Sequence, residues 1–299
     1  MSAYPARQSS ASASPSLSTI GGGLSRRAVV GGGLAGAALA FASGGARAAA
    51  PPPLRIQRLA WAGVRFQLPG ATLFVDPLID SAVWGTALPD RLIGVNDAVG
   101  DTVVLVTHRH SDHADPAAIA AALKSGGTLA YAAGTPPFDG LPNKVRQRAC
   151  PLWEPQLFGD FTATPVPASD GYGDLQVSWV ISGGGRRMFH GGDTMMHGNW
   201  WRIGRQFGHF DAAFLPINGA AFAFQQPATD ESAVLTPKQA MAAATILGAE
   251  RIVPIHFGID GADKYTETPR PAQALDALGV AGGPRVVHLQ PGDWLDWRS

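Results

Sequence analysis

The chain has 299 residues and balances 23 Lys and Arg against 23 Asp and Glu, so its formal net charge is zero. A balanced charge argues against a nucleic-acid-binding protein, which normally presents a basic face to phosphates. The one cysteine, Cys150, excludes an internal disulfide framework and a structural zinc site built from cysteines.

The first fifty residues differ in composition from the rest of the chain. They contain four arginines and no acidic residue, and Arg26-Arg27 precede a Gly- and Ala-rich apolar run at residues 28–42. A basic region, an apolar region and a small-residue site, in this order, are typical of a secretory signal. The arginine pair favours the twin-arginine (Tat) route, so we expect residues 1–50 to be a Tat-type signal peptide and leader, and the mature protein to be periplasmic or secreted.

An uncleaved membrane anchor is the alternative for this segment. The apolar run is shorter than the ~20 residues that a membrane span requires, so we expect no stable span after cleavage. Without the four leader arginines, 19 basic residues against 23 acidic residues give the mature chain a formal charge of −4.

Residues 51–299 alternate short apolar runs with turn signals and contain no second linker, which predicts a single domain. Asp115-Pro116 is a typical helix start, and Thr236 with Gln239 forms a capping box. We expect strands within 55–68 and at 72–75, 103–106 and 251–255, and helices at 117–123, from 236 to about 248, and at 271–278. This pattern predicts an α/β fold (α+β) with sheet at its centre.

A dense group of metal-ligating side chains follows the strand at 103–106. The segment Thr107-His108-Arg109-His110-Ser111-Asp112-His113 places three imidazoles and one carboxylate within six residues. His108 and His110 share a face because side chains two apart in extended chain point the same way. Asp112 and His113 lie past the turn, so one segment is able to serve two adjacent metal ions.

Two further strand ends carry single candidate ligands. Asp193 lies in a Gly-Gly-Asp-Thr turn, and His256 follows the strand at 251–255. Each signal is weak alone, because a carboxylate in such a turn often bonds its own backbone. No G-x-S-x-G elbow is present, so the sequence does not support a serine hydrolase of that type.

The three motifs together, H-x-H-x-D-H, G-D-T and P-I-H-F-G, resemble the metallo-β-lactamase fold superfamily of metal-dependent hydrolases. Further segments, Phe74-Val75-Asp76-Pro77 and 210–217, are similar to one branch of it. That branch holds the ascorbate-6-phosphate lactonase-like proteins and the N-acyl-phosphatidylethanolamine phospholipase D-like enzymes. The resemblance implies a four-layer αββα sandwich with two divalent metal ions, zinc by preference, at one edge. A carboxylate ligand at Asp170 would make the donor set harder, so that manganese or iron would also be accepted.

The resemblance also implies a role for each candidate ligand. His108 and His110 would bind the first metal; Asp112, His113 and His256 would bind the second; and Asp193 would bridge the two. Asp112 would also be catalytic by orienting the metal-bound hydroxide. The complete expected set of metal ligands is His108, His110, Asp112, His113, Asp170, Asp193 and His256.

Asp170 departs from the family pattern, because it occupies the place of a further histidine ligand. It would ligate the metal directly, since a carboxylate oxygen reaches zinc at about the same ~2.0–2.2 Å as an imidazole nitrogen. A single-metal site and a degenerate site that does not turn substrate over are the other two interpretations. Asp174 is a substitute ligand or an ordinary loop acid.

Other side chains near these motifs are expected to support them. Asp76 and His190 are interpreted as supporting residues, and Trp200-Trp201 with Phe222 and Phe224 as an apolar substrate wall on loops. The function predicted is an exported hydrolase that cleaves an ester, lactone or phosphodiester bond in a small-molecule or lipid-derived substrate. The alternatives are phospholipase D-like action on a lipid head group and a non-catalytic metal- or ligand-binding protein.

Overall fold

The computed structural model describes residues 53–223, 227 and 229–298. The predicted signal peptide at 1–50 lies outside the described residues, as does Phe224, so both assignments stay predictions. No helix of the described part is both long and apolar enough to cross a membrane.

The first sheet has six strands in chain order, with β1, β2 and β3 antiparallel and β3 to β6 parallel. Its strands are β1 (Arg55–Arg58), β2 (Val64–Leu68), β3 (Ala71–Val75), β4 (Asp101–Leu105), β5 (Gly127–Ala132) and β6 (Val145–Cys150). A 3₁₀ turn, η1 (Gly85–Ala87), lies between β3 and β4.

The second sheet has seven strands in the order β15-β13-β11-β10-β9-β8-β7. Its strands are β7 (Gln156–Phe158), β8 (Phe161–Pro167), β9 (Val177–Gly183), β10 (Arg186–His190), β11 (Ala212–Pro216), β13 (Arg251–Ile255) and β15 (Arg285–Val286). A separate two-stranded ribbon pairs β12 (Ala221–Phe222) with β14 (Tyr265–Thr266).

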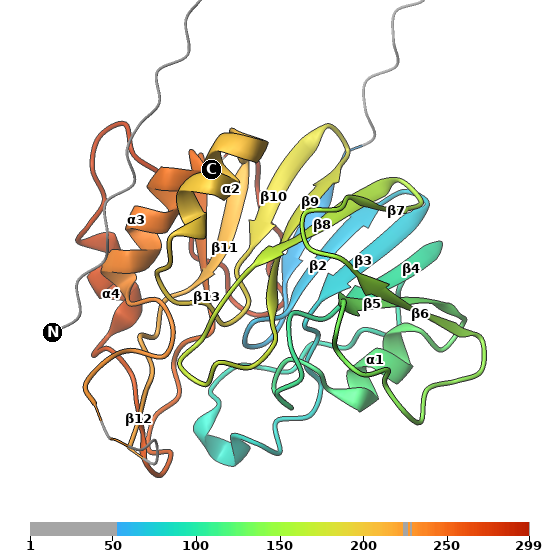
Figure 1. Cartoon of the computed structure of the whole chain (residues 1–299), viewed down its shortest axis with the longest axis horizontal. Coiled ribbons are helices and arrows are strands. Elements are labelled where there is room, and N and C mark those ends of the chain that lie inside the picture. Colours follow the sequence, from blue (N-terminus) through green and yellow to red (C-terminus); the bar gives the residue numbers. More distant parts are fainter. Residues whose placement is uncertain (1–52, 224–226, 228, 299) are drawn as a thin grey trace, which may run out of the picture. The chain divides into compact units, whose positions relative to one another are not determined.

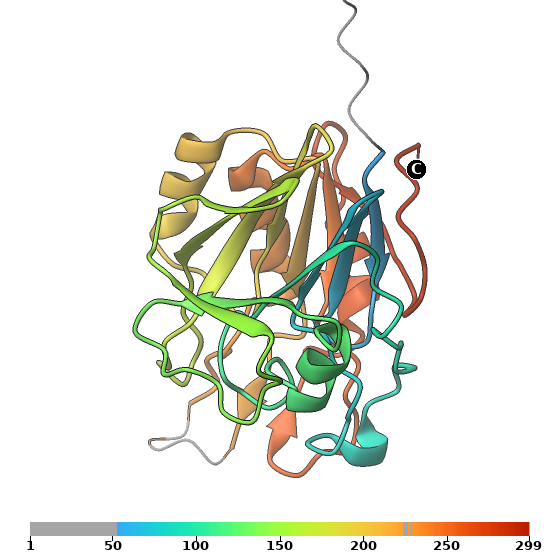
Figure 2. The same cartoon turned by 90° about the vertical axis from the view of Figure 1, so that its right-hand side faces the viewer.

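The two sheets pack face to face with helices on their outer faces, which confirms the predicted αββα layering (Figures 1 and 2). One apolar cluster joins the sheets, where Phe66 of β2 meets Phe214 of β11 with ring centroids 5.8 Å apart. A second cluster lies between the second sheet and its helices, and a third lies beneath α1. The helices are α1 (Pro116–Ala122), α2 (Asn199–Phe207), α3 (Pro237–Leu247) and α4 (Pro271–Asp276).

The predicted helix starts are confirmed by their hydrogen bonds. The Asp115 carboxylate accepts bonds from the first backbone N–H groups of α1, and Thr236 forms the predicted capping box with Gln239 at the start of α3. Helix α2 was not expected, and the prediction that Trp200 and Trp201 lie on a loop was wrong. Trp200 lies in this helix and is fully buried against Phe189 of β10.

The topology brings several strand ends to one edge of the sandwich. β3 and β4 run parallel in the first sheet, and β8, β10 and β13 run in a common direction in the second. Their carboxyl ends lead into the loops drawn at the lower edge of Figure 1. The predicted ligands all follow these strand ends, so separate segments of the sequence converge there.

Candidate metal centre

The first ligand group consists of His108, His110 and Asp193, whose nitrogen and oxygen atoms all lie within 4.8 Å of one another. His108 Nε2 is 2.9 Å from His110 Nδ1 and 3.8 Å from Asp193 Oδ2. The predicted shared face of the two histidines therefore directs both rings toward one point.

The second group consists of Asp112, His113 and His256, also within 4.8 Å of one another. Oδ1 of Asp193 lies 3.1 Å from His113 Nε2 and 2.7 Å from His256 Nε2. Asp193 therefore faces the first group with one oxygen and the second group with the other, as the bridging role requires.

Several atoms of this centre are buried without a hydrogen-bond partner. They include His113 Nε2, His256 Nε2 and Asp193 Oδ1, which approach one another without hydrogen-bond geometry. Buried polar atoms normally have partners, and imidazole nitrogen and carboxylate oxygen are ligands that zinc prefers. The donor set therefore fits a divalent cation.

The charges within the centre are strongly coupled. Burial would lower the pKa of His113, but the carboxylates of Asp193 and Asp112 outweigh it and raise this pKa well above its ordinary value. Burial would raise the pKa of Asp193, but His113 and His256 hold this pKa well below its ordinary value. Burial lowers the pKa of His108, and His113 adds to this effect. The imidazoles and carboxylates of the centre therefore shift one another's pKa values.

Asp76 orients the His113 ring through its Nδ1 atom, on the side of the ring opposite Nε2. Its Oδ2 lies 2.8 Å from His113 Nδ1, and it accepts bonds from the backbone N–H and hydroxyl of Thr107 at 2.8 and 2.6 Å. Such a carboxylate fixes the ring and the tautomer of a ligating histidine. The interpretation of Asp76 as a supporting residue agrees with these contacts.

His190 also supports the site and ligates nothing. Its Nε2 donates to the carbonyl of Ala62 at 2.8 Å, and its Nδ1 accepts from the N–H of Gly192 at 3.2 Å. Both ring nitrogens are used, and the bond to Gly192 holds the turn that presents Asp193.

Asp112 accepts two bonds that the sequence did not reveal. The indole N–H groups of Trp61 and Trp84 donate to the same oxygen, Oδ2, at 3.0 and 3.2 Å. Trp61 follows β1 and Trp84 precedes η1, so neither lies near Asp112 in the sequence.

Three non-glycine residues at the site adopt left-handed backbone conformations: Trp61, Asp76 and His256, with φ of 57°, 43° and 55°. Such conformations cost of order 1–3 kcal/mol each and cluster at functional sites. Each of the three lies where the chain leaves a strand to present its side chain to the centre.

Asp170 lies beside the centre, and its two carboxylate oxygens have different surroundings. Its Oδ1 accepts from the N–H groups of Tyr172 and Gly173, both at 2.9 Å, whereas its buried Oδ2 has no hydrogen-bond partner. It belongs to neither compact ligand group of the described residues. Burial raises its pKa, the N–H of Gly173 opposes this, and Asp193 raises it further.

Asp174 lies against His110 rather than against the shared centre. Its Oδ2 is 2.9 Å from His110 Nε2, the ring nitrogen that faces away from His108. Asp174 therefore holds His110 as Asp76 holds His113, a role that the sequence analysis did not anticipate.

A cavity of about 260 Å³ opens directly above the ligands. Its lining includes Asp112, Asp193 and His256 from the centre, together with four aromatic side chains: Trp84, Tyr172, Phe222 and Tyr265. Phe222 was expected in an apolar wall and does line this cavity. Trp200 and Trp201 do not.

A third group of possible ligands, His209, Asp211 and Glu250, lies on the surface. Asp211 is engaged by Arg186 at 2.7 Å, and Glu250 by Arg251 at 2.8 Å. These pairings make it an ordinary cluster of surface ion pairs.

Comparisons with known proteins agree with this geometry. Residues 71–257 match the family model of the β-lactamase superfamily domain, and this matched segment is more than half of the chain. The chain belongs to the β-lactamase superfamily. A UPF0173 metal-dependent hydrolase from Rubrobacter xylanophilus is 29% identical over 218 residues, covering 68% of this chain and 81% of that protein.

Another superfamily relative and a solved structure extend the comparison. A UPF0173 metal-dependent hydrolase from Thermus thermophilus is 27% identical over 243 residues, covering 75% of this chain and 90% of the relative. Igni18, described as a metallo hydrolase from Ignicoccus hospitalis, has a TM-score of 0.57 at 18% identity, covering 81% of this chain and 97% of that chain. The protein is thus a metal-dependent hydrolase with the metallo-β-lactamase fold, and its branch within the superfamily stays a prediction.

Proposed function

We propose that the protein hydrolyses an ester, lactone or phosphodiester bond at a centre of two divalent metal ions, zinc by preference and otherwise manganese or iron. The observation that carries the proposal is the position of Asp193, whose two oxygens face the two separate ligand groups. A carboxylate placed in this way is suited to join two ions rather than to hold one.

The chain's own residues divide the work of hydrolysis. Bound divalent ions would make water more acidic and polarise the substrate oxygen under attack. Asp112 lines the cavity, so it would orient the attacking water and hold its proton, while the two indole N–H groups fix the carboxylate. Asp76 and Asp174 fix the rings of His113 and His110. The aromatic walls exclude bulk water from the reacting atoms.

Metal counting together with a substrate screen tests the proposal. The protein is loaded separately with zinc, manganese or iron, metal per chain is measured by elemental analysis, and esters, lactones and phosphodiesters are assayed. We expect close to two ions per chain and hydrolysis that a chelator abolishes. The Asp193→Asn variant should bind at least one ion fewer per chain, and its kcat should be lower by about 100-fold or more. The Asp139→Asn variant, changed at an exposed position, should match the unaltered protein in both metal content and kcat.

The rival functions predict different results in the same experiment. A non-catalytic metal-binding protein would bind ions and hydrolyse none of the three substrate classes. A phospholipase D-like enzyme would cleave phosphodiesters of lipid head groups in preference to esters and lactones.

We also propose that residues 1–50 direct export by the twin-arginine route. The arginine pair, the short apolar run and the small-residue site support this assignment. Replacing Arg26 and Arg27 together by lysine should retain the protein in the cytoplasm, as measured by cell fractionation. Periplasmic or secreted protein at unchanged levels would contradict the proposal.

A further inference from the structure

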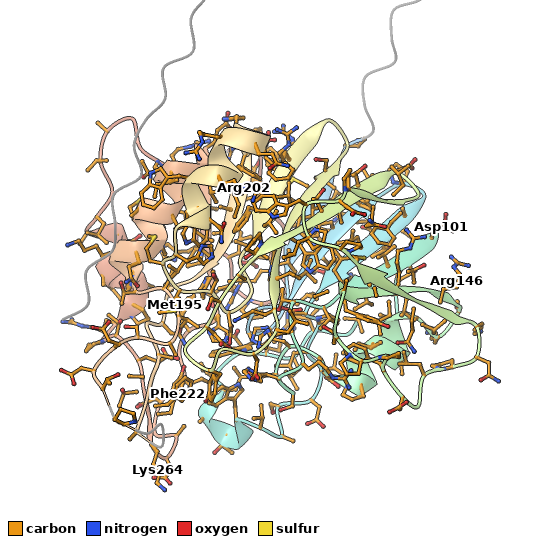
Figure 3. All side chains as sticks on the ribbon, in the orientation of Figure 1. Asp101, Arg146, Met195, Arg202, Phe222 and Lys264 are labelled. Atoms are coloured by element: carbon orange, nitrogen blue, oxygen red, sulfur yellow. The ribbon has the colours of Figure 1, made fainter. Side chains whose placement is uncertain are left out.

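Aromatic rings form a continuous arc over the metal centre, from the second ligand group to the first. The arc begins on His256, ends on His110, and has successive ring centroids 4.0 to 5.5 Å apart. We name its five members the aromatic collar; in order they are Trp61, Trp84, Tyr265, Phe222 and Tyr172. They come from five separate parts of the chain, and Figure 3 shows Phe222 nearer the centre of the molecule than Lys264, which lies at the tip of the same ribbon.

The polar atoms of three collar members, Trp61, Trp84 and Tyr265, are engaged by neighbouring side chains. Both indole N–H groups donate to Asp112. The hydroxyl of Tyr265 accepts from Asn218 and donates to Glu267, at 2.7 Å in each case. Trp84, Phe222 and Tyr265 therefore present mainly ring surface to the cavity.

Among the described lining residues, no lysine or arginine is placed to balance a negative charge in this cavity. The charged members of this described lining are Asp112 and Asp193. Arg109 follows His108 directly but is turned away, because it donates to the carbonyls of Pro136 and Pro137 and packs over Phe138.

The site carboxylates also reduce the attraction of the centre for anions. Asp112 and Asp193 would offset half of the positive charge that two divalent ions bring, and the Asp170 carboxylate lies beside them. Asp174, an exposed carboxylate outside the lining of this cavity, adds a further negative charge next to His110. An anionic substrate would face these carboxylates without an arginine or lysine partner, and buried unpaired charge is costly.

We propose that the aromatic collar selects an uncharged substrate, an ester or lactone of a small apolar carboxylic acid, and disfavours phosphodiesters and other anions. The proposal rests on the proposed hydrolase function and narrows it. The cavity of about 260 Å³ is smaller than the ~300–1,000 Å³ pockets that hold drug-sized ligands, which suits a small substrate.

Kinetics on matched esters test the selection. The metal-loaded full chain is assayed with p-nitrophenyl butyrate, with the p-nitrophenyl monoester of succinate, which adds one carboxylate to the same acyl length, and with bis(p-nitrophenyl) phosphate. We expect kcat/KM for the butyrate ester to exceed that for either anion at least 10-fold. Equal values, or a preference for an anion, would overturn the proposal.

Binding to the metal-free protein provides a readout that does not depend on turnover. Hexanamide and hexanoate are titrated while the indole N–H signals of Trp84 and Trp61 are followed by NMR. Hexanamide should shift the Trp84 signal at concentrations at least 5-fold lower than hexanoate. A stronger effect of hexanoate, or no effect of either probe, would overturn the collar proposal even if esters are hydrolysed. Conversely, hexanamide could bind more tightly than hexanoate while no metal-dependent turnover is found. That result would refute the proposed hydrolysis and leave the collar proposal standing.

A charge substitution adds a third test. Phe222→Lys places a cation in the collar without changing a candidate ligand, and should reduce the preference for the butyrate over the succinate ester at least 5-fold. Phe222→Leu keeps the position apolar and should retain the preference. Trp201→Lys, at a half-exposed aromatic on α2 outside the cavity, makes a comparable charge change and should leave the preference unaltered. An unaltered preference in Phe222→Lys would contradict the proposal.

Discussion

Asp112 is held by two indole N–H groups on the same carboxylate oxygen. Hydrogen bonds to a charged group contribute about 1.5–3 kcal/mol each, so together they fix the side chain firmly. Trp61 is fully buried and has a left-handed backbone, whereas Trp84 is half-buried on a loop. Trp84 is therefore the donor that can be changed with little effect on the fold.

Trp84→Phe should weaken the positioning of Asp112 while keeping an aromatic ring in place. We expect roughly 10-fold weaker binding of the second metal ion and roughly 10-fold lower kcat, because the carboxylate loses one charge-assisted bond. Metal titration and steady-state kinetics measure the two effects, with Trp201→Phe as the matched control. Unchanged metal affinity would show that Trp61 alone positions Asp112.

Asp170→Asn separates ligation from turn formation at this residue. Asparagine keeps an oxygen acceptor for the N–H groups of Tyr172 and Gly173 but replaces Oδ2 by an amide nitrogen that does not bind metal. If Asp170 is a ligand, the variant should fold normally and bind the first ion at least 10-fold more weakly, as measured by elemental analysis and metal titration. Asp170→His should shift preference toward zinc and keep hydrolysis. Normal metal binding in Asp170→Asn would assign Asp170 to the turn.

At the scale of secondary-structure elements, local geometry predicted the arrangement within segment 107–113, whereas the convergence of Asp193 and His256 on it was implied by the family resemblance. Spacing within 107–113 is enough to place His108 and His110 on one face, and each strand is followed directly by its ligand. Trp61 and Trp84 were missed because their bonds to Asp112 span 51 and 28 residues and no periodicity marks them.

Helix α2 was missed for an equally physical reason. It has no capping side chain at Gly198, and it contains Gly204, a residue that disfavours helix. A side chain on Gly204 would lie 2.4 Å from the backbone oxygen of Ile246 in α3, so the glycine permits close packing of two helices. This tertiary requirement leaves no signal in the local sequence.

The end of β10 is held by a neutral histidine, which makes stability depend on pH. Burial lowers the pKa of His190, and the Asp76 carboxylate only partly opposes this. Below the ordinary histidine pKa of about 6.5 the unfolded chain therefore binds a proton that the folded chain does not. The free energy of unfolding should fall as pH drops from 7.5 to 5, by up to about 1.4 kcal/mol per pH unit from this residue.

His190→Gln keeps an amide donor for the carbonyl of Ala62 but does not titrate in this range. Urea unfolding at pH 7.5, 6 and 5 should show a shallower loss of stability in the variant than in the unaltered protein. Parallel losses in both proteins would show that His190 does not contribute to the acid sensitivity.

For the molecule as a whole, the centre joins the two sheets. The candidate ligands of segment 107–113 follow a strand of the first sheet, and Asp193, His256 and the neighbouring Asp170 follow strands of the second. The apolar cluster between the sheets continues to this edge, where buried polar atoms without partners replace apolar contacts. Metal bound here would therefore stabilise the packing of one sheet on the other as well as serve catalysis.

This arrangement predicts that metal binding raises thermal stability. At a metal concentration about 100 times the dissociation constant, binding to the folded state alone contributes about 2.7 kcal/mol. At 2–4 °C per kcal/mol for a domain of this size, the melting temperature should rise by about 5–10 °C on loading and fall again with a chelator, as measured by calorimetry. Asp193→Asn should lose most of the increase, because Asp193 is the residue whose carboxylate faces both ligand groups, whereas Asp139→Asn should keep it. Equal melting temperatures with and without metal would contradict a centre that joins the sheets.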